Sequence, residues 1–421
     1  MGISSISTFG KRGVTASLIG GLSVAVIAGA ASLASPGMSL TAAHVAAPSN
    51  DLPPTGTVLP LFAPAYMGSH WSMTQAQAVT VAHDFNLVAA QANIFAPYVA
   101  AMKAANPGLK IVAYLNGTFD QSAGGTKYAA SWYELDAAGS KVRSRGFGNY
   151  LMNPSNPAWG QNVAAECAAA MASSHYDGCF LDTMGTAPLG SGYVTGLPID
   201  PATHAVWTAN AWITATESVA AAVKATNPGA IVIPNGLSSG GKYFSSNAST
   251  APLLTPTGAA MAEVWIRTAG QSVTSFPKES KWLQDVTMLV DAENAGQSVL
   301  TTTKLFTTSN QTQQNQWHKL ALASFLLAAN GHSYFSFVAS KTNTAILANS
   351  AWDHVAIGTP LGAYIQSGSL FGRSFTNGVV WVNPNSTPQT VTFSAQHLNL
   401  AGVEVTSETL APNTGDVFLQ G

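Results

Sequence analysis

From residue 57 to about residue 340, short apolar runs alternate with helical segments, and this alternation constrains the fold more than any other feature of the chain. Apolar runs of this length between helices are typical of buried strands. The strand-like runs are residues 58–63, 86–93, 110–116, 178–182, 230–235, 259–265, 287–291 and 333–338. The clearest helical segments are residues 74–84, 157–173, 202–226 and 311–330. Strands that are apolar on both faces and separated by helices predict a parallel sheet.

Eight such units predict an α/β chain built as a (β/α)8 TIM barrel over residues 57–363. A doubly wound open sheet is the alternative, but no G-x-G-x-x-G motif follows the first strand to support it. After about residue 364 the helical spacing stops, and apolar and polar residues alternate between turn residues. This pattern predicts a small C-terminal antiparallel β domain over residues 364–421.

The amino-terminal segment has the pattern of an export signal. Lys11 and Arg12 precede an uncharged apolar run over residues 14–34 that ends in small residues, as in a secretory signal peptide. The run is also long enough to span a membrane, so an uncleaved anchor is the alternative, and membrane contact is expected only through it. We predict a signal or anchor at residues 1–34, a linker at residues 35–56, and a secreted or cell-envelope location. In such a compartment Cys167 and Cys179 could form a disulfide or remain buried thiols.

The composition narrows the possible partners. Charged residues make up 9% of the chain, against about 25% in an average soluble protein, so neutral polar groups must cover most of the surface. The 17 Lys and Arg residues are scattered and the net charge is −2, whereas binding to nucleic acid needs clustered positive charge. Nucleic acid is therefore excluded as a partner, and the sequence does not predict an oligomeric state.

Two acids stand at the ends of predicted strands. In a (β/α)8 barrel the carboxyl ends of the strands meet at one mouth, which holds the active site. Asp182 ends the fourth predicted strand and Glu263 lies in the last part of the sixth, so the two can face each other. Glycosidic cleavage needs two opposed carboxylates, of which one protonates the leaving oxygen and the other attacks the sugar or activates water. We predict Asp182 as the nucleophile or general base and Glu263 as the general acid.

Each assignment has a structural alternative. Asp182 could cap a helix or a turn, and Glu263 could form a structural ion pair with Arg267 or Lys242. Further residues near predicted strand ends are candidates for sugar hydrogen bonds, stacking or the shape of the mouth. They are Asn116, Asn235, Trp265, Asp291 and Glu293. The asparagines could equally cap turns, and the two acids could cap a loop.

The sequence offers no sign of a metal or another cofactor. The nine histidines are dispersed without an H-E-x-x-H motif, and neither cysteine has the spacing of a metal site. A G-x-S-x-G elbow, which would favour serine hydrolase chemistry, is also absent from the sequence. We therefore predict no metal and no cofactor.

Several segments resemble a known family. They are YDGCFLDTMG at 176–185, IPNG at 233–236, Ala262 with Glu263, FTNGVVWVNP at 375–384 and TLAP at 409–412. They resemble TIM-barrel glycosidases of the hypothetical glycoside-hydrolase-like family fifteen and, more distantly, polygalactosaminidase- and dextranase-like barrels. The resemblance implies a carbohydrate substrate, a strand-four nucleophile or base at Asp182 and a strand-six acid at Glu263.

The sequence therefore predicts an exported glycoside hydrolase that cleaves O-glycosidic bonds of a polysaccharide or oligosaccharide. A catalytically silent carbohydrate-binding protein of the cell surface is the alternative, because a neutral polar surface with abundant aromatic residues suits either function.

Overall fold

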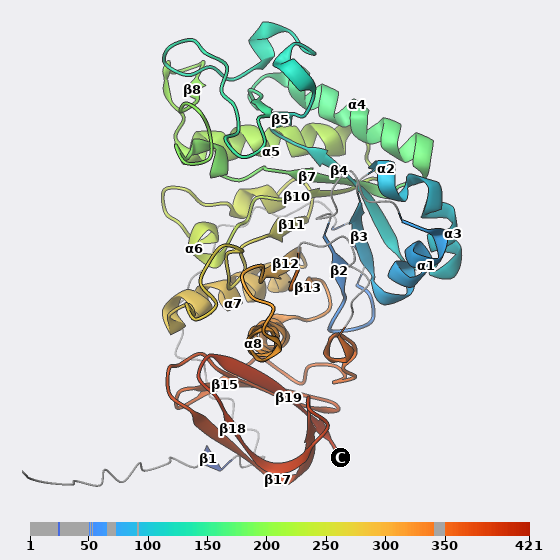
Figure 1. Ribbon diagram of the computed structural model, residues 1–421, viewed down its shortest axis with the longest axis vertical. Helices are drawn as coiled ribbons and strands as arrows, with labels where there is room; N and C mark the ends of the chain where they lie inside the picture. The colour runs from blue at the N-terminus through green and yellow to red at the C-terminus, as the bar shows by residue number, and fades with distance from the viewer. Residues whose placement is uncertain are drawn as a thin grey trace, which may run out of the picture.

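A computed structural model gives the fold of most of the chain (Figure 1). It describes residues 24–25, 50, 52, 54–64, 73–90, 92–340 and 350–421. Apart from residues 24–25, the predicted signal lies outside these residues, and so does most of the linker. None of the helices among the described residues is long and apolar enough to span a membrane.

Eight parallel strands form the centre of the larger part of the molecule. They are β2 (Phe62–Ala63), β3 (Leu87–Ala90), β4 (Lys110–Asn116), β7 (Gly178–Asp182), β10 (Ile231–Pro234), β11 (Ala259–Ala262), β12 (Ser298–Lys304) and β13 (Tyr334–Val338). One sheet has the order β10-β7-β4-β3-β2 and the other the order β11-β12-β13. Parallel bridges from Leu61 to Phe335 and from Asn235 to Met261 join the two sheets at both edges. The strands thus follow one another in the order of a (β/α)8 barrel.

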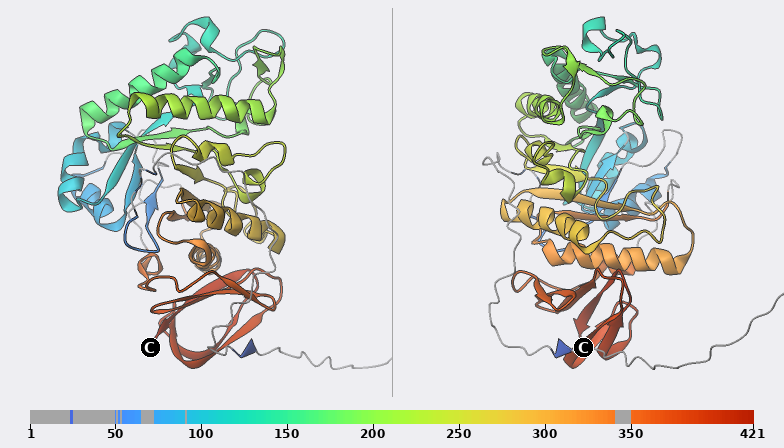
Figure 2. Two further views of the ribbon diagram at one scale, coloured as in Figure 1. Left: turned by 180° about the vertical axis from the view of Figure 1, so that it is seen from behind. Right: turned by 90° about the vertical axis from the view of Figure 1, so that its left-hand side faces the viewer.

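Helices connect most of these strands and lie outside them (Figures 1 and 2). They are α1 (Gln75–Asp84), α2 (Ala92–Phe95), α3 (Val99–Ala105), α4 (Pro157–Ser174), α5 (Ala209–Thr226), α6 (Gly240–Tyr243), α7 (Glu279–Asn294) and α8 (Gln311–Ala328). Side-chain oxygens cap the first turns of four of the longer helices, at Thr74, Asn156, Thr208 and Asn310. Each accepts a hydrogen bond from a backbone N–H that the helix leaves unpaired, which fixes where the helix begins.

The predicted strand at 287–291 is wrong, because these residues belong to α7. Trp282, Val286 and Leu289 are buried at helical spacing on one face of α7. The seventh strand is instead β12, which contains three consecutive threonines, Thr301, Thr302 and Thr303. Two of their hydroxyls donate to carbonyls of neighbouring segments: Thr301 to Tyr334 at 3.1 Å and Thr303 to Trp265 at 3.0 Å.

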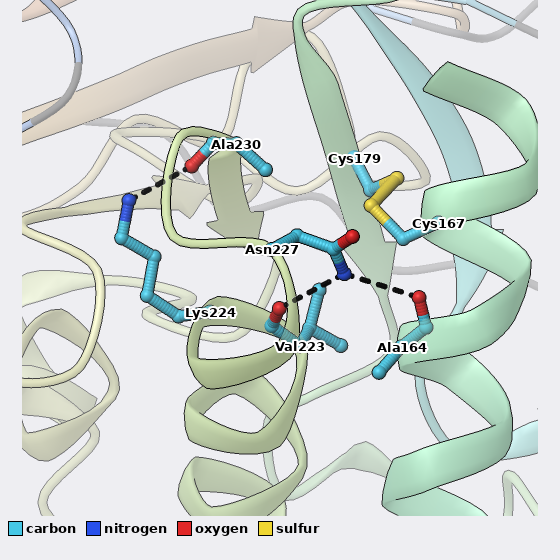
Figure 3. The surroundings of a disulfide bond; sticks show 7 residues. All are labelled: Ala164, Cys167, Cys179, Val223, Lys224, Asn227 and Ala230. Carbon is cyan, nitrogen blue, oxygen red and sulfur yellow. Dashed lines mark hydrogen bonds between the residues drawn. A yellow bond between two sulfur atoms is a disulfide. The ribbon is translucent and has the colours of Figure 1, made fainter. Parts of the chain in front are cut away.

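A disulfide between Cys167 and Cys179 joins α4 to β7 (Figure 3), which decides between the two states left open above. The side chain of Asn227, at the end of α5, donates to the carbonyls of Ala164 in α4 and Val223 in α5, each at 3.1 Å. The two helices are therefore tied to each other and to the strand that ends at Asp182.

Loops after β4 and β7 carry short antiparallel pairs. β5 (Phe119–Asp120) pairs with β6 (Tyr150–Leu151), and β8 (Ile199–Asp200) pairs with β9 (Ala205–Val206). These loops lie together beyond the carboxyl ends of β4 and β7 (Figure 1), so they are placed to form walls of any site at those strand ends.

The remaining strands form a C-terminal antiparallel sheet below α8 (Figure 2). They are β14 (Ile365–Ser367), β15 (Leu370–Phe375), β16 (Gly378–Asn383), β17 (Gln389–Asn399), β18 (Glu404–Leu410) and β19 (Thr414–Gln420), and β1 (Val24–Ala25) pairs with β17. Lys319 of α8 forms an ion pair with Asp416 of β19. The Arg373 guanidinium donates to the carbonyls of Leu326 at 3.1 Å and Ala329 at 2.8 Å, so buried polar contacts join this sheet to α8.

Candidate active site

Four side chains point into the mouth at the carboxyl ends of the strands. Side chains alternate between the two faces of a strand, and Val112, Phe180, Ile233 and Met261 belong to one buried cluster on the same face of the parallel strands. The residues two positions further on, Tyr114, Asp182, Asn235 and Glu263, therefore face inward at the next level. The strand ends thus bring two carboxylates, a phenol and an amide together.

Asp182 is held by donors on both of its oxygens. The Tyr114 hydroxyl donates to Oδ2 at 2.7 Å, and Asn235 Nδ2 and the Thr183 backbone N–H donate to Oδ1 at 2.9 and 2.8 Å. Burial and the negative charge of Glu263 raise the pKa of Asp182, while these three donors act in the opposite direction. The carboxylate is therefore fixed in one orientation beside a second negative charge.

Asn235 joins the two acids. Its Nδ2 donates to Asp182 Oδ1 and to Glu263 Oε2, each at 2.9 Å. Because both bonds meet at one nitrogen, the two oxygens lie no more than twice 2.9 Å, or 5.8 Å, apart. The bridge between Asn235 and Met261 fixes the backbone of β10 beside that of β11 and holds this geometry in place.

Lys304, at the end of β12, is a site residue that the sequence did not reveal. Its Nζ lies 2.6 Å from Glu263 Oε1, with the lysine side chain 13% and the glutamate side chain 29% exposed. The predicted ion-pair partner Arg267 instead donates to the Lys304 carbonyl at 3.0 Å and packs over Trp317. Lys304 reaches the mouth because it is the last residue of β12, the seventh strand. The sequence pattern placed the seventh strand at 287–291 and therefore gave no reason to single out Lys304.

Tyr193, in the loop after β7, is a second neighbour of the pair that the sequence did not reveal. Burial and the charges of Asp182 and Glu263 raise the pKa of its phenol. Arg145 holds this loop: its backbone N–H donates to the Tyr193 carbonyl at 2.8 Å, and its Nε donates to the Val194 carbonyl at 2.7 Å. The contact depends on the folded loops, and sequence spacing gives no signal for it.

Asn116 lies beside the pair but shapes a turn. Its Oδ1 accepts from the backbone N–H groups of Thr118 at 3.1 Å and Phe119 at 2.8 Å, and its Nδ2 donates to Thr183 Oγ1 at 3.4 Å. The turn-capping alternative therefore describes Asn116, whereas Asn235 joins the two acids.

Trp265 does not reach the mouth. It is completely buried, its indole N–H donates to the Asp285 carbonyl at 3.1 Å, and its ring packs edge-on against Phe325 of α8. The prediction that it stacks on sugar is wrong because β11 ends at Ala262, and the chain after Glu263 turns the indole towards α7 and α8.

Asp291 and Glu293 are not at a strand end, because both lie in the last turns of α7. The Tyr243 hydroxyl donates to Asp291 Oδ2 at 2.8 Å. Glu293 is buried and accepts from the backbone N–H groups of Asn330 at 2.9 Å and Ser333 at 2.7 Å, just before β13 begins. It lies at the amino ends of the strands, so the prediction that these acids line the mouth is wrong.

Among the described residues, no group of three or more histidine, cysteine, aspartate or glutamate side chains could hold a metal ion. The groups that the structure gathers at the mouth are two close carboxylates, the Lys304 ammonium group, the Asn235 amide and the phenols of Tyr114 and Tyr193.

A model of hypothetical glycosyl hydrolase family 15 matches residues 103–379. This range is well over half of the chain, and it contains Asp182, Glu263 and the neighbours of these two acids that are described above. The chain belongs to this family. Its members are classed as glycoside hydrolases, so a carbohydrate is the substrate class and glycosidase activity is the reaction class. No curated protein matches the chain.

Solved structures with some similarity are glycoside hydrolases and related enzymes. The glycoside hydrolase domain of PelA from Pseudomonas aeruginosa is 15% identical with a TM-score of 0.40, over 66% of this chain and 94% of that one. The debranching enzyme of Nostoc punctiforme is 9% identical with a TM-score of 0.48, over 88% and 100%. The GH36 α-galactosidase AgaA from Geobacillus stearothermophilus is 9% identical with a TM-score of 0.47, over 86% and 55%. At these values the similarity does not bear on the residues of the mouth.

Proposed function

We propose that the chain is an exported glycosidase of the (β/α)8 barrel type that hydrolyses O-glycosidic bonds of a polysaccharide or oligosaccharide with Asp182 and Glu263. The observation that carries the proposal is the single amide nitrogen of Asn235, which donates to both carboxylates. A carboxylate that only caps a loop does not require a second carboxylate bound to the same donor.

In the proposed reaction Glu263 protonates the leaving oxygen while Asp182 attacks the anomeric carbon, forming a glycosyl-enzyme. Glu263, now ionised, removes a proton from water, which attacks the same carbon and releases Asp182. Retaining glycosidases hold their carboxyl groups about 5–5.5 Å apart and inverting ones about 6.5–9.5 Å apart. The upper limit of 5.8 Å between the bridged oxygens supports retention.

The neighbours of the two acids support different roles for them. Every protein group that contacts Asp182 in the bonds described above is a donor, which suits an ionised nucleophile. The Lys304 ammonium stabilises the charge that Glu263 acquires when it gives up its proton. The same ion pair favours the ionised form of Glu263 before the reaction, so removal of the Lys304 charge should change how activity depends on pH.

Export is supported by the apolar leader and by the disulfide between Cys167 and Cys179, since disulfides persist outside the reducing cytosol. Mass spectrometry of the protein from the host's exterior tests this: a mature amino terminus after about residue 34 is expected. An intact chain in the cytosol with reduced cysteines would contradict export.

The activity is tested by incubating purified protein with cell-envelope and plant polysaccharides and measuring released reducing ends. We expect Asp182→Asn and Glu263→Gln each to lower the parent rate by about 10³-fold. Asp291→Asn is the matched control, because this acid lies on α7, and it should keep the parent rate. A parent activity that survives both mouth substitutions would rule out the proposed pair.

A catalytically silent carbohydrate-binding protein is the second candidate, and the ion pair that occupies Glu263 favours it. It predicts that the protein binds a polysaccharide of the panel without releasing reducing ends at any pH from 4 to 8.

A further inference from the structure

A cleft of about 650 Å³ lies between α7, the end of α8 and the first strands of the C-terminal sheet. In Figure 1 α7 lies directly above the edge of this sheet that carries β15. The volume is within the range of sites that bind small molecules, about 300–1,000 Å³. The cleft contains neither Asp182 nor Glu263, so it is separate from the mouth.

The lining of the cleft combines apolar and neutral polar side chains. Leu283, Val290, Leu327 and Phe371 are apolar members of the lining, and the half-buried ring of Tyr364 lies 6.2 Å from the ring of Phe371 at an interplanar angle of 53°. Besides Tyr364, the neutral hydrogen-bonding side chains of the lining are Ser280, Gln284, Thr287, Asn294, Asn330 and Gln366. An aromatic face with amides and hydroxyls around it matches a ligand that has an apolar face and a rim of hydroxyl groups.

The charges of the lining do not favour an ionic ligand. Arg373 is buried and directs its guanidinium to the carbonyls of Gly362, Leu326 and Ala329 at 2.8, 3.1 and 2.8 Å. Glu279 is the other charged residue of the lining and stands in the first turn of α7. The cleft therefore suits a neutral ligand better than an anion or a cation.

The segment that carries Tyr364 adds apolar surface beside the cleft. Leu361 is 66% and Ile365 is 49% exposed. The backbone N–H of Leu361 donates to the Ser374 carbonyl at 2.9 Å and Ile365 pairs with Gly372, so Tyr364 is presented from a segment that the sheet supports on both sides of it.

We propose that this cleft is a second carbohydrate-binding site, which takes a neutral stretch of polysaccharide with Tyr364 packed against a sugar ring. The choice of carbohydrate rests on the proposed function. Such a site would hold the enzyme on an extended or insoluble substrate while a distant part of the chain enters the mouth.

The test measures retention on insoluble polysaccharides by full-length protein carrying Asp182→Asn, so that hydrolysis does not interfere. Adding Tyr364→Ala should weaken retention by about tenfold, because the sugar loses the aromatic ring against which it packs. Tyr364→Phe keeps the ring and should restore retention to within about twofold. Thermal unfolding of each variant confirms that the C-terminal sheet remains folded.

In the otherwise native enzyme, Tyr364→Ala should leave hydrolysis of short soluble oligosaccharides within about twofold of the parent rate and slow hydrolysis of insoluble substrate. Equal retention of the Asp182→Asn protein with and without Tyr364→Ala would overturn the second site, and so would absence of retention on every polysaccharide of the panel. Retention that depends on Tyr364, in a protein whose native form releases no reducing ends, would support the cleft and contradict only the proposed hydrolysis.

Discussion

The two acids at the mouth, Asp182 and Glu263, are held differently from two buried acids of α7, Glu293 and Asp285. Glu293 and Asp285 accept from backbone N–H groups: Glu293 from Asn330 and Ser333, and Asp285 from Gly240 at 2.6 Å and Ile266 at 3.0 Å. Asp182 and Glu263 instead share the side-chain amide of Asn235.

This difference separates structural acids from candidate catalytic ones. Backbone donors tie a carboxylate to the path of the chain, so α7 is fastened to the loops that follow β10 and β11 and to the start of β13. A shared amide fixes the distance between two carboxylates without fastening either to a distant segment. Position at a predicted strand end did not distinguish these cases, whereas a single donor shared between two acids does.

The largest effect in this comparison is expected from Asn235→Ala, which removes the donor common to both acids. We expect kcat/KM to fall by about 10²–10³-fold, the cost of losing one well-placed donor in an active site, with little change in the unfolding temperature. Asn116→Ala is the control, because this asparagine bonds a turn, and a loss below about tenfold is expected. A kcat/KM of Asn235→Ala within threefold of the parent value would mean that the shared amide does not contribute to catalysis.

Glu293→Gln should lower the stability of the protein and leave its activity nearly unchanged. Glutamine offers one acceptor oxygen where the carboxylate serves donors on both oxygens, so a buried N–H loses its partner and the free energy of unfolding should fall by about 2–3 kcal/mol. Urea denaturation measures this loss, and activity per folded molecule should stay within about twofold. A loss of activity without a loss of stability would place Glu293 in the catalytic machinery.

Lys304→Met sharpens the assignment of roles at the mouth. Without the ammonium group the carboxylate of Glu263 is less stable, so the group holds its proton to higher pH. If Glu263 is the general acid, the alkaline limb of the kcat/KM profile moves to higher pH. A shift of the acid limb instead would exchange the roles of Glu263 and Asp182.

The smallest effect concerns Glu134, a buried acid in the loop walls that accepts from the Trp207 indole at 3.1 Å. Burial raises the pKa of Glu134 to about 8, above its value in the unfolded chain, about 4.3. The folded state therefore binds more protons between these values, and its stability falls as pH rises from about 4.3 to 8. Glu134→Gln keeps the indole contact, so its urea midpoint should fall less over this range; an equal fall in both proteins would contradict the assignment.

Much of the fold could be predicted because its signals are local. Helix α4, for example, has an N-cap and a helical stripe, and Asp182 and Glu263 follow apolar runs whose alternation sets the inward face. The run at 287–291 carries no such distinction, since a short apolar segment suits a buried helix as well as a strand. Because the seventh strand was predicted at this run, β12 was not predicted, and neither was the position of Lys304 at its end.

Other parts of the site depend on contacts that sequence spacing does not encode. Trp265 turns away from the mouth because its indole fills space between α7 and α8, and Tyr193 comes near the acids because Arg145 holds its loop. Both outcomes are set by residues far along the chain, so neither could be inferred from the strand ends.

Azide rescue tests the proposed pair most directly, with an activated aryl glycoside of the sugar that the native enzyme releases. In Asp182→Gly, azide should restore turnover and give a glycosyl azide of the anomeric configuration opposite to the substrate, because azide replaces the missing nucleophile. In Glu263→Gly it should give the retained configuration, because azide attacks the glycosyl-enzyme formed on Asp182. The opposite pattern in the two variants would exchange the roles, and the absence of a glycosyl azide from both would contradict a retaining pair at Asp182 and Glu263.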